Sequence, residues 1–453
     1  MLIEFRTENH RSIREEQVIS MEAMKRLGDA DDPRPRCIDG YRNSLLPVAA
    51  IYGANASGKS NMLSAMGFMR EAVLHSHNKW NPEGGINRDP FAWGTGNEHP
   101  SFFEVIILVD GIKYQYGFEL NDEQITEEWL FAWPKGHKQK WFTRENDNYS
   151  FGEHLTGDRE LIKRNTRMNS LFLSTAVQNN NEVVLPVFRW FQRLQIIRVG
   201  TGSNRVKSKE FYIPVQFAIA TFLSEGITNQ SRQNFMEKTG VNSQLIDRFK
   251  DLMKKADVGI CDFRVVKKEI IEEGVRKELE LIEFKHDKDD ENSWLPETEQ
   301  SSGTKTWISL SFFMLLALTH GKTIVVDEIE SKLHPLLVME IIKAFNDPLS
   351  NPKNAQLVFS THDPKLLGPL FDQPALRRDQ IWLTEKNQSG ETQITPLTNF
   401  KARKNENIEF GYLQGRFGAI PFLNNLGKFD WESYDEPLGK NASRGEKAPK
   451  SID

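Results

Sequence analysis

The amino-acid sequence predicts an α/β fold that carries an antiparallel β insert and a helical insertion. Residues 45–52 form a short apolar run bounded by glycine, and apolar side chains then recur at helical spacing through residues 62–73. Residues 323–328 form a second apolar run, which ends in two acids. Residues 102–119 alternate around an Asp-Gly pair, which is a strong signal for a β-hairpin.

Four parts of the chain follow from these patterns. Residues 205–260 show apolar side chains at spacings of three and four, which indicates helices, and residues 262–284 return to strand character. The polar end of the chain is expected to be disordered. The predicted parts are 1–200, the N-terminal part of the core domain with the hairpin insert, 201–299, the helical and strand insertion, 300–400, the C-terminal part of the core domain, and 401–453, a C-terminal extension.

Composition favours a cytoplasmic protein. The 453 residues carry a net charge of −5, so the charge of the whole chain does not favour strong non-specific DNA binding. Cys37 and Cys261 form neither a disulfide framework nor a paired-cysteine metal motif, which suits a reducing cytosol. The most apolar stretch, residues 308–318, is shorter than the about 20 residues that span a bilayer. We therefore expect no membrane span, and since residues 1–6 are charged and lack a long apolar region, we expect no signal peptide.

Residues 53–60, Gly-Ala-Asn-Ala-Ser-Gly-Lys-Ser, fit the pattern of a phosphate-binding loop. Glycines let the backbone N–H groups face phosphate oxygens, and the following helix directs its positive end at the same anion. We expect Lys59 to reach the β- and γ-phosphates of ATP and Ser60 to bind Mg²⁺. A chance glycine turn is the alternative, but the strand before and the helix after favour the phosphate loop. The predicted ATP-binding residues here are Gly53, Asn55, Ala56, Ser57, Gly58, Lys59, Ser60 and Asn61.

Asp327 and Glu328 end the second apolar strand. Charges are rarely buried without a partner, and the carboxyl ends of parallel strands face the ligand crevice of an α/β sheet. We expect Asp327 to hold Mg²⁺ and Glu328 to orient or deprotonate the attacking water. Two acids after a strand can also cap the next helix, but the phosphate loop favours the catalytic interpretation.

Four further segments follow a recognisable order along the chain. They are residues 300–305, Gln-Ser-Ser-Gly-Thr-Lys, residues 331–335, Ser-Lys-Leu-His-Pro, residues 358–363, Val-Phe-Ser-Thr-His-Asp, and residues 9–13, Asn-His-Arg-Ser-Ile. They resemble the signature motif, the D-loop, the strand that ends in the switch histidine, and the N-terminal strand turn of ABC-class ATPases in their SMC/RecF-like branch. The resemblance implies a P-loop nucleotide-binding domain that hydrolyses ATP to ADP and phosphate.

Three further segments resemble one group of proteins within this branch. Residues 103–114 resemble the hairpin insert of bacterial AAA ATP-binding proteins from abortive-infection and phage-defence operons, and residues 171–174 and 412–418 resemble other blocks of the same proteins. The resemblance implies a separate effector protein, a toxin or a nuclease, as a partner.

The resemblance also assigns roles to residues outside the phosphate loop. It places Ser302 and Gly303 against ATP held by a second subunit, so that a homo-oligomer forms composite ATP sites, and it makes His362 catalytic. Thr304 stands where the signature has its second glycine. Gln178 is the candidate for the glutamine that binds Mg²⁺, and an ordinary glutamine on a helix surface is its alternative. Taken alone, Ser302 would be a helix N-cap.

Two functions remain open at this point. The first is an ATP-driven switch subunit that controls a toxin or nuclease in antiviral defence. The second is a DNA-repair ATPase of the RecF/SMC kind that clamps DNA directly, so nucleic acid stays open as a partner. The residues between 200 and 300 leave little room for a long coiled coil, which disfavours the second function. A single-chain ATPase-nuclease is disfavoured because few residues follow His362.

Overall fold

The computed structural model describes most of the chain and forms two compact units, Met1–Ile420 and Pro421–Asp453. Only Pro421 of the second unit is described. The predicted helices of residues 205–240 and the expected disorder of the polar tail lie outside the described residues. Described are residues 1–27, 32–198, 241–255, 259–272, 275–369, 374–400 and 406–421.

A six-stranded sheet forms the centre of the first unit, in the order β16-β15-β3-β14-β13-β9. The five strands from β15 to β9 are mutually parallel, and β16 pairs with β15 in the antiparallel sense. The sheet confirms the predicted α/β core. Its strands are β3 (Val48–Gly53), β9 (Gln195–Arg198), β13 (Thr323–Asp327), β14 (Gln356–Thr361), β15 (Ile381–Lys386) and β16 (Thr392–Pro396).

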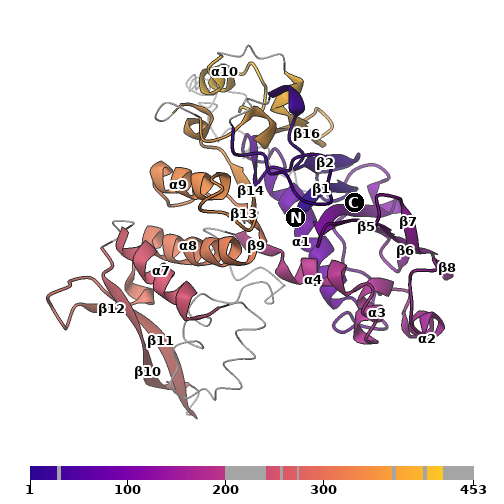
Figure 1. The fold of residues 1–453 in the computed structure, drawn as a ribbon, viewed down its shortest axis with the longest axis horizontal. Coiled ribbons are helices and arrows are strands. Elements are labelled where there is room, and N and C mark those ends of the chain that lie inside the picture. The colour runs from indigo at the N-terminus through magenta and orange to yellow at the C-terminus, as the bar shows by residue number, and fades with distance from the viewer. Residues whose placement is uncertain are drawn as a thin grey trace, which may run out of the picture. The chain divides into compact units, whose positions relative to one another are not determined.

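Strand β3 is buried on both faces, as its uninterrupted apolar run requires. Val48, Ala50 and Tyr52 belong to one hydrophobic cluster, together with buried residues of α8 (Ser302–His320) and α9 (Pro335–Asn346). Ala49 and Ile51 belong to a second cluster, together with the apolar side of α1 (Lys59–His75). Figure 1 shows α1 on one side of the parallel strands and α8 and α9 on the other.

A seven-stranded antiparallel sheet provides the second layer, in the order β2-β1-β4-β5-β6-β7-β8. The predicted hairpin is confirmed, because β4 and β5 pair up to Val109 and Ile112 around Asp110 and Gly111. Both turn residues have positive φ, 50° and 75°, which suits an Asp-Gly pair. The strands are β1 (Leu2–Glu8), β2 (Gln17–Ser20), β4 (Ser101–Val109), β5 (Ile112–Leu120), β6 (Ile125–Trp133), β7 (Gln139–Glu145) and β8 (Asn148–Phe151).

The remaining elements are shorter helices and a small sheet. Helices α2 (Arg159–Asn165), α3 (Phe172–Gln178) and α4 (Leu185–Arg193) follow the antiparallel sheet in the chain. The described part of the insertion contains α7 (Ser243–Lys255) and a three-stranded antiparallel sheet, and α10 (Ile408–Leu413) comes last. The strands of the small sheet are β10 (Asp262–Glu272), β11 (Val275–Lys285) and β12 (Trp294–Pro296). None of the helices in the described residues is long and apolar enough to cross a membrane.

Candidate functional site

The phosphate loop connects the end of β3 to the start of α1. Gly58 immediately precedes the helix with φ of 111°, a left-handed conformation that a side chain strains. A Cβ atom at Gly58 would also collide with the side chain of Thr392. The glycine is therefore required both by its own backbone and by its neighbour.

Hydroxyl groups from distant segments brace this loop. Ser57 Oγ lies 2.7 Å from Thr384 Oγ1 on β15, and Thr392 Oγ1 on β16 donates to the Ser57 carbonyl at 2.9 Å. Ser12 Oγ lies 2.7 Å from Thr392 Oγ1 and accepts from Asn61 Nδ2 at 2.6 Å. Thr384 and Thr392 were not predicted as part of the site, because nothing in their local sequence distinguishes them from other strand residues.

Lys59 is buried against its own loop. Its Nζ donates to the carbonyls of Gly53 at 2.7 Å and Ala54 at 3.0 Å. Burial lowers the pKa of Lys59, and the negative charges of Glu330 and Glu328 oppose that shift. The ammonium group therefore lies among the loop carbonyls with acidic groups nearby, where a phosphate can replace the carbonyls as its partner.

Asp327 lies at the end of β13 and receives two hydroxyl groups. Ser60 Oγ donates to Asp327 Oδ1 at 3.0 Å, and Ser360 Oγ donates to the same oxygen at 2.6 Å. The backbone N–H of Glu328 donates to Ser360 Oγ at 2.8 Å. Strands β13 and β14 are adjacent and parallel, so their carboxyl ends bring these groups to one edge of the sheet.

The donor set at this edge suits Mg²⁺. The Ser60 hydroxyl and the Asp327 carboxylate are oxygen ligands, which this ion prefers, and Mg²⁺ commonly uses one or two protein ligands together with substrate phosphates. In the described part of the chain, no group of three His, Cys, Asp or Glu side chains could hold a metal without a further ligand. The ligands that are present therefore fit an ion that arrives with a nucleotide.

Glu328 and His362 lie beyond the ends of neighbouring strands. Glu328 is exposed and has φ of 53°, a left-handed conformation that is uncommon for residues other than glycine. His362 is 60% exposed, and its Nδ1 lies 2.8 Å from Oε1 of Glu330. Glu330 was not predicted as part of the site, although it is the third acid in the segment Asp-Glu-Ile-Glu.

Ser302 and Gly303 begin α8 instead of lying within this group. Ser301 is the N-cap, because its Oγ accepts from the backbone N–H of Thr304 at 3.1 Å. Gly303 adjoins the segment after β13, since a Cβ there would lie 2.9 Å from the Lys332 carbonyl. Ser302 is exposed at the first turn of the helix, where a second molecule can reach it.

The structure does not bring Gln178 to the phosphate loop. It is the exposed last residue of α3, and α3 lies against the far end of α1. Leu171 N donates to Ser76 Oγ at 3.1 Å, and Thr175 Oγ1 lies 3.1 Å from His77 Nδ1. Helix α1 has 17 residues, or about 25 Å at 1.5 Å per residue, so Gln178 is remote from Ser60. The geometry favours the ordinary surface glutamine.

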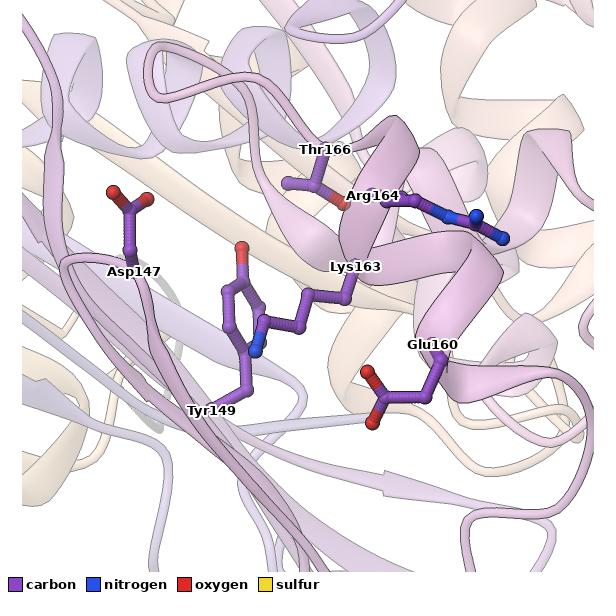
Figure 2. A pocket seen from close by; sticks show the side chains of 6 residues that line it. All are labelled: Asp147, Tyr149, Glu160, Lys163, Arg164 and Thr166. Carbon is purple, nitrogen blue, oxygen red and sulfur yellow. The ribbon is translucent and has the colours of Figure 1, made fainter.

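A separate surface hollow of about 560 Å³ lies between β8 and α2. Figure 2 shows Tyr149 beside the side chain of Lys163, with Asp147 and Glu160 on either side. Lys163 Nζ lies 5.5 Å from the centre of the Tyr149 ring. The lining mixes both signs of charge and contains no residue of the phosphate loop, so the hollow is distinct from the candidate site.

Comparisons with known proteins give a family match and a similarity to solved structures. The family described as "AAA domain, putative AbiEii toxin, Type IV TA system" matches residues 48–195 and 200–368, well over half of the chain. Among solved structures, the Smc head domain with an extended coiled coil bound to the C-terminal domain of ScpA, from Pyrococcus furiosus, is 12% identical with a TM-score of 0.38. That similarity covers 87% of this chain and 95% of the other. No curated protein matches the chain significantly.

Proposed function

The chain belongs to the family of AAA domains that matches it, and from this premise we propose that it binds ATP with Mg²⁺, hydrolyses the ATP, and thereby switches a separate effector protein. The family match confirms the predicted P-loop fold and the relation to abortive-infection ATPases. The effector, a toxin or a nuclease acting in bacterial phage defence, is the finer part of the proposal.

One observation carries the ATPase proposal. The phosphate-loop hydroxyl of Ser60 and the strand-end carboxylate of Asp327 meet at 3.0 Å, although 267 residues separate them. Their oxygens would hold Mg²⁺, which shields the phosphate charge, and Lys59 would donate to the β- and γ-phosphates. Glu328, next to Asp327 and exposed, would orient the attacking water.

Nucleotide binding tests the first step. We expect the wild-type chain to bind a fluorescent ATP analogue with Mg²⁺ and to release phosphate, and we expect Lys59→Ala to lose most of both. Lys343→Ala, which removes an exposed lysine of α9, is the matched control. Equal binding and turnover by Lys59→Ala and the control would contradict the proposal.

The exposed position of Ser302 supports composite sites between two copies of the chain. In that arrangement, Ser302 and Gly303 of one copy contact the γ-phosphate held by Lys59 of the other. Lys59→Ala chains mixed with Ser302→Arg chains should recover part of the turnover, because each mixed dimer regains one intact site. Mixed dimers that form but do not hydrolyse ATP would argue against this assembly.

The switch role requires that nucleotide binds two states of an assembly with different affinity. Supporting observations are the layers beyond the phosphate-loop core, the seven-stranded sheet and the insertion with its own small sheet. Co-expression with the product of the neighbouring gene should give a complex whose stability differs between ATP and ADP. ATP-dependent DNA binding by the isolated chain, with no protein partner, would overturn the switch in favour of a DNA clamp.

A further inference from the structure

Glu330 lies in the turn after β13, which contacts the end of β14. The strands pair in register up to Val326 and Phe359, and the N–H of Ile329 donates to the Ser360 carbonyl at 3.2 Å. These backbone bonds fix the turn against the neighbouring strand. They place the Glu330 carboxylate, whose side chain is 10% exposed, directly beside His362.

A single carboxylate oxygen holds His362 in two ways. Oε1 of Glu330 accepts from the backbone N–H of His362 at 2.8 Å and lies 2.8 Å from its ring Nδ1. An ionised carboxylate can only accept, so this contact favours the form of the ring in which Nδ1 carries the hydrogen. The second ring nitrogen, Nε2, is then the one left for a ligand, and the ring is 60% exposed.

We propose that Glu330 is a positioning residue, which orients the His362 imidazole so that Nε2 meets the γ-phosphate or the attacking water of bound ATP. This inference rests on the proposed ATPase function. A carboxylate that fixes the tautomer and direction of a histidine is a common arrangement in sites where the histidine touches the reacting groups.

A purely structural role explains the contacts less well. Oε2 of Glu330 is buried and accepts no hydrogen bond from any described residue. A carboxylate that served only to close the turn would leave that oxygen in water or give it a donor. The negative charge of Glu330 also raises the pKa of Lys59, against the larger effect of burial, so this carboxylate lies near the lysine that we propose to bind phosphate.

The test is a double-mutant cycle on ATP turnover. We expect Glu330→Ala and His362→Ala each to lower kcat by about 10–100-fold, with KM changed less than about threefold. The double variant should be no slower than His362→Ala alone, because Glu330 acts through the ring. Glu330→Gln should retain more turnover, since its amide oxygen can still accept from both donors, and it replaces Glu330→Ala if that variant does not fold. Glu340→Gln, on the exposed side of α9, is the control.

A second readout keeps this test separate from the ATPase proposal. In protein labelled with ¹⁵N-histidine and free of nucleotide, the His362 signal is assigned by its loss in His362→Ala. At alkaline pH we expect the Nδ1–H form in the wild type and a shift towards the Nε2–H form in Glu330→Ala. Absence of turnover in the wild type would contradict the ATPase proposal alone. An unchanged tautomer in Glu330→Ala, or kcat losses that multiply in the double variant, would overturn the positioning role.

Discussion

Two carboxylates have different surroundings: Glu128 is fully buried in the antiparallel sheet, and Glu330 is partly buried at the edge of the parallel sheet. Glu128 is fully buried and saturated, since it accepts from the N–H groups of Phe172 at 2.6 Å and Leu173 at 3.0 Å and from Tyr116 Oη at 3.0 Å. Glu330 has donors on one oxygen only. Glu128 therefore connects α3 to the antiparallel sheet, whereas Glu330 has one oxygen that can still accept a hydrogen bond from another group.

This difference suggests a structural role for the acid of the antiparallel sheet and a catalytic role for the acids at the edge of the parallel sheet. Burial raises the pKa of Glu128, whereas the nearby Arg144 guanidinium and the donors at the start of α3 lower it. The same layer contributes no carboxylate to the phosphate-loop edge. At that edge, Asp327 is half-buried and Glu328 is exposed, as the roles that we propose for them require. An acid whose two oxygens both accept hydrogen bonds has a structural role. The acids that can still accept a hydrogen bond or bind a ligand are the ones that we assign to catalysis.

The largest effect should come from Glu328→Gln. Its turnover should fall by about 10²–10⁴-fold, because an amide cannot take a proton from the attacking water. Its ATP affinity and thermal midpoint should stay close to the wild-type values, since the exposed side chain keeps its shape. Stopped-flow phosphate release and nucleotide binding measure the two quantities. Full turnover in this variant would place the catalytic acid elsewhere.

Glu128→Ala should show the reverse pattern. Removing one partner of a buried charged pair costs about 3–5 kcal/mol of unfolding free energy, because Arg144 loses its counter-charge and the N–H groups of Phe172 and Leu173 lose their acceptor. ATP affinity of the folded fraction should not change. Urea unfolding against Glu127→Ala, the exposed neighbour on the same strand, measures the effect. A similar, small loss of unfolding free energy in both variants would contradict the structural role of Glu128 and its contrast with Glu330.

Short-range features were predictable because their signals lie in a few adjacent residues. The loop from Gly53 to Ser60, the acids at 327 and 328 and the hairpin at 102–119 each combine a local pattern with a backbone requirement. The order of the six-stranded sheet was not predicted, since it depends on which strands pair across large separations. The helices of residues 205–240 cannot be compared, because they lie outside the described residues.

The site residues that were not predicted are held in place by contacts between segments far apart in the sequence. Thr384 reaches Ser57 across 327 residues, and Ser360 reaches Asp327 only because β14 lies beside β13. Serine and threonine are common in strands, so no local signal marks these two. Glu330 could not be predicted for the same reason, since the pairing of β13 with β14 brings it next to His362.

Ser360→Ala should weaken Mg²⁺ binding rather than catalysis itself. The Ser360 hydroxyl donates to Asp327 and accepts from the Glu328 backbone, so its loss frees the carboxylate that we propose to bind Mg²⁺ to reorient. Loss of such a supporting contact typically costs about 10–100-fold in metal affinity. Turnover measured over a range of Mg²⁺ concentrations should recover at high Mg²⁺, whereas Ser350→Ala, an exposed serine, should match the wild type. A fall that high Mg²⁺ does not reverse would assign Ser360 a different role.

Two histidines near the phosphate loop extend the contrast. His362 is exposed beside the acids, whereas His10 is buried, with Nε2 2.9 Å from Ser64 Oγ and its ring against Phe68 and Phe103. Burial lowers the pKa of His10 to about 3. A histidine in the unfolded chain has a pKa of about 6.5, so the unfolded state binds one proton more between these two values. Proton uptake by His10 therefore has no effect on stability above about pH 6.5 and destabilises the folded state progressively as the pH falls towards 3.

His10→Gln should make the stability less sensitive to acid. The amide can keep a hydrogen bond to Ser64 but takes up no proton, so the variant lacks the contribution of about 1.4 kcal/mol per pH unit that a single histidine gives in this range. Urea unfolding at several pH values between 6.5 and 5 should therefore give a smaller slope for His10→Gln than for the wild type. His137→Gln, an exposed histidine in the turn between β6 and β7, should keep the wild-type slope. Equal slopes in all three proteins would mean that His10 is not held neutral in the folded state, and the contrast with His362 would then rest on exposure alone.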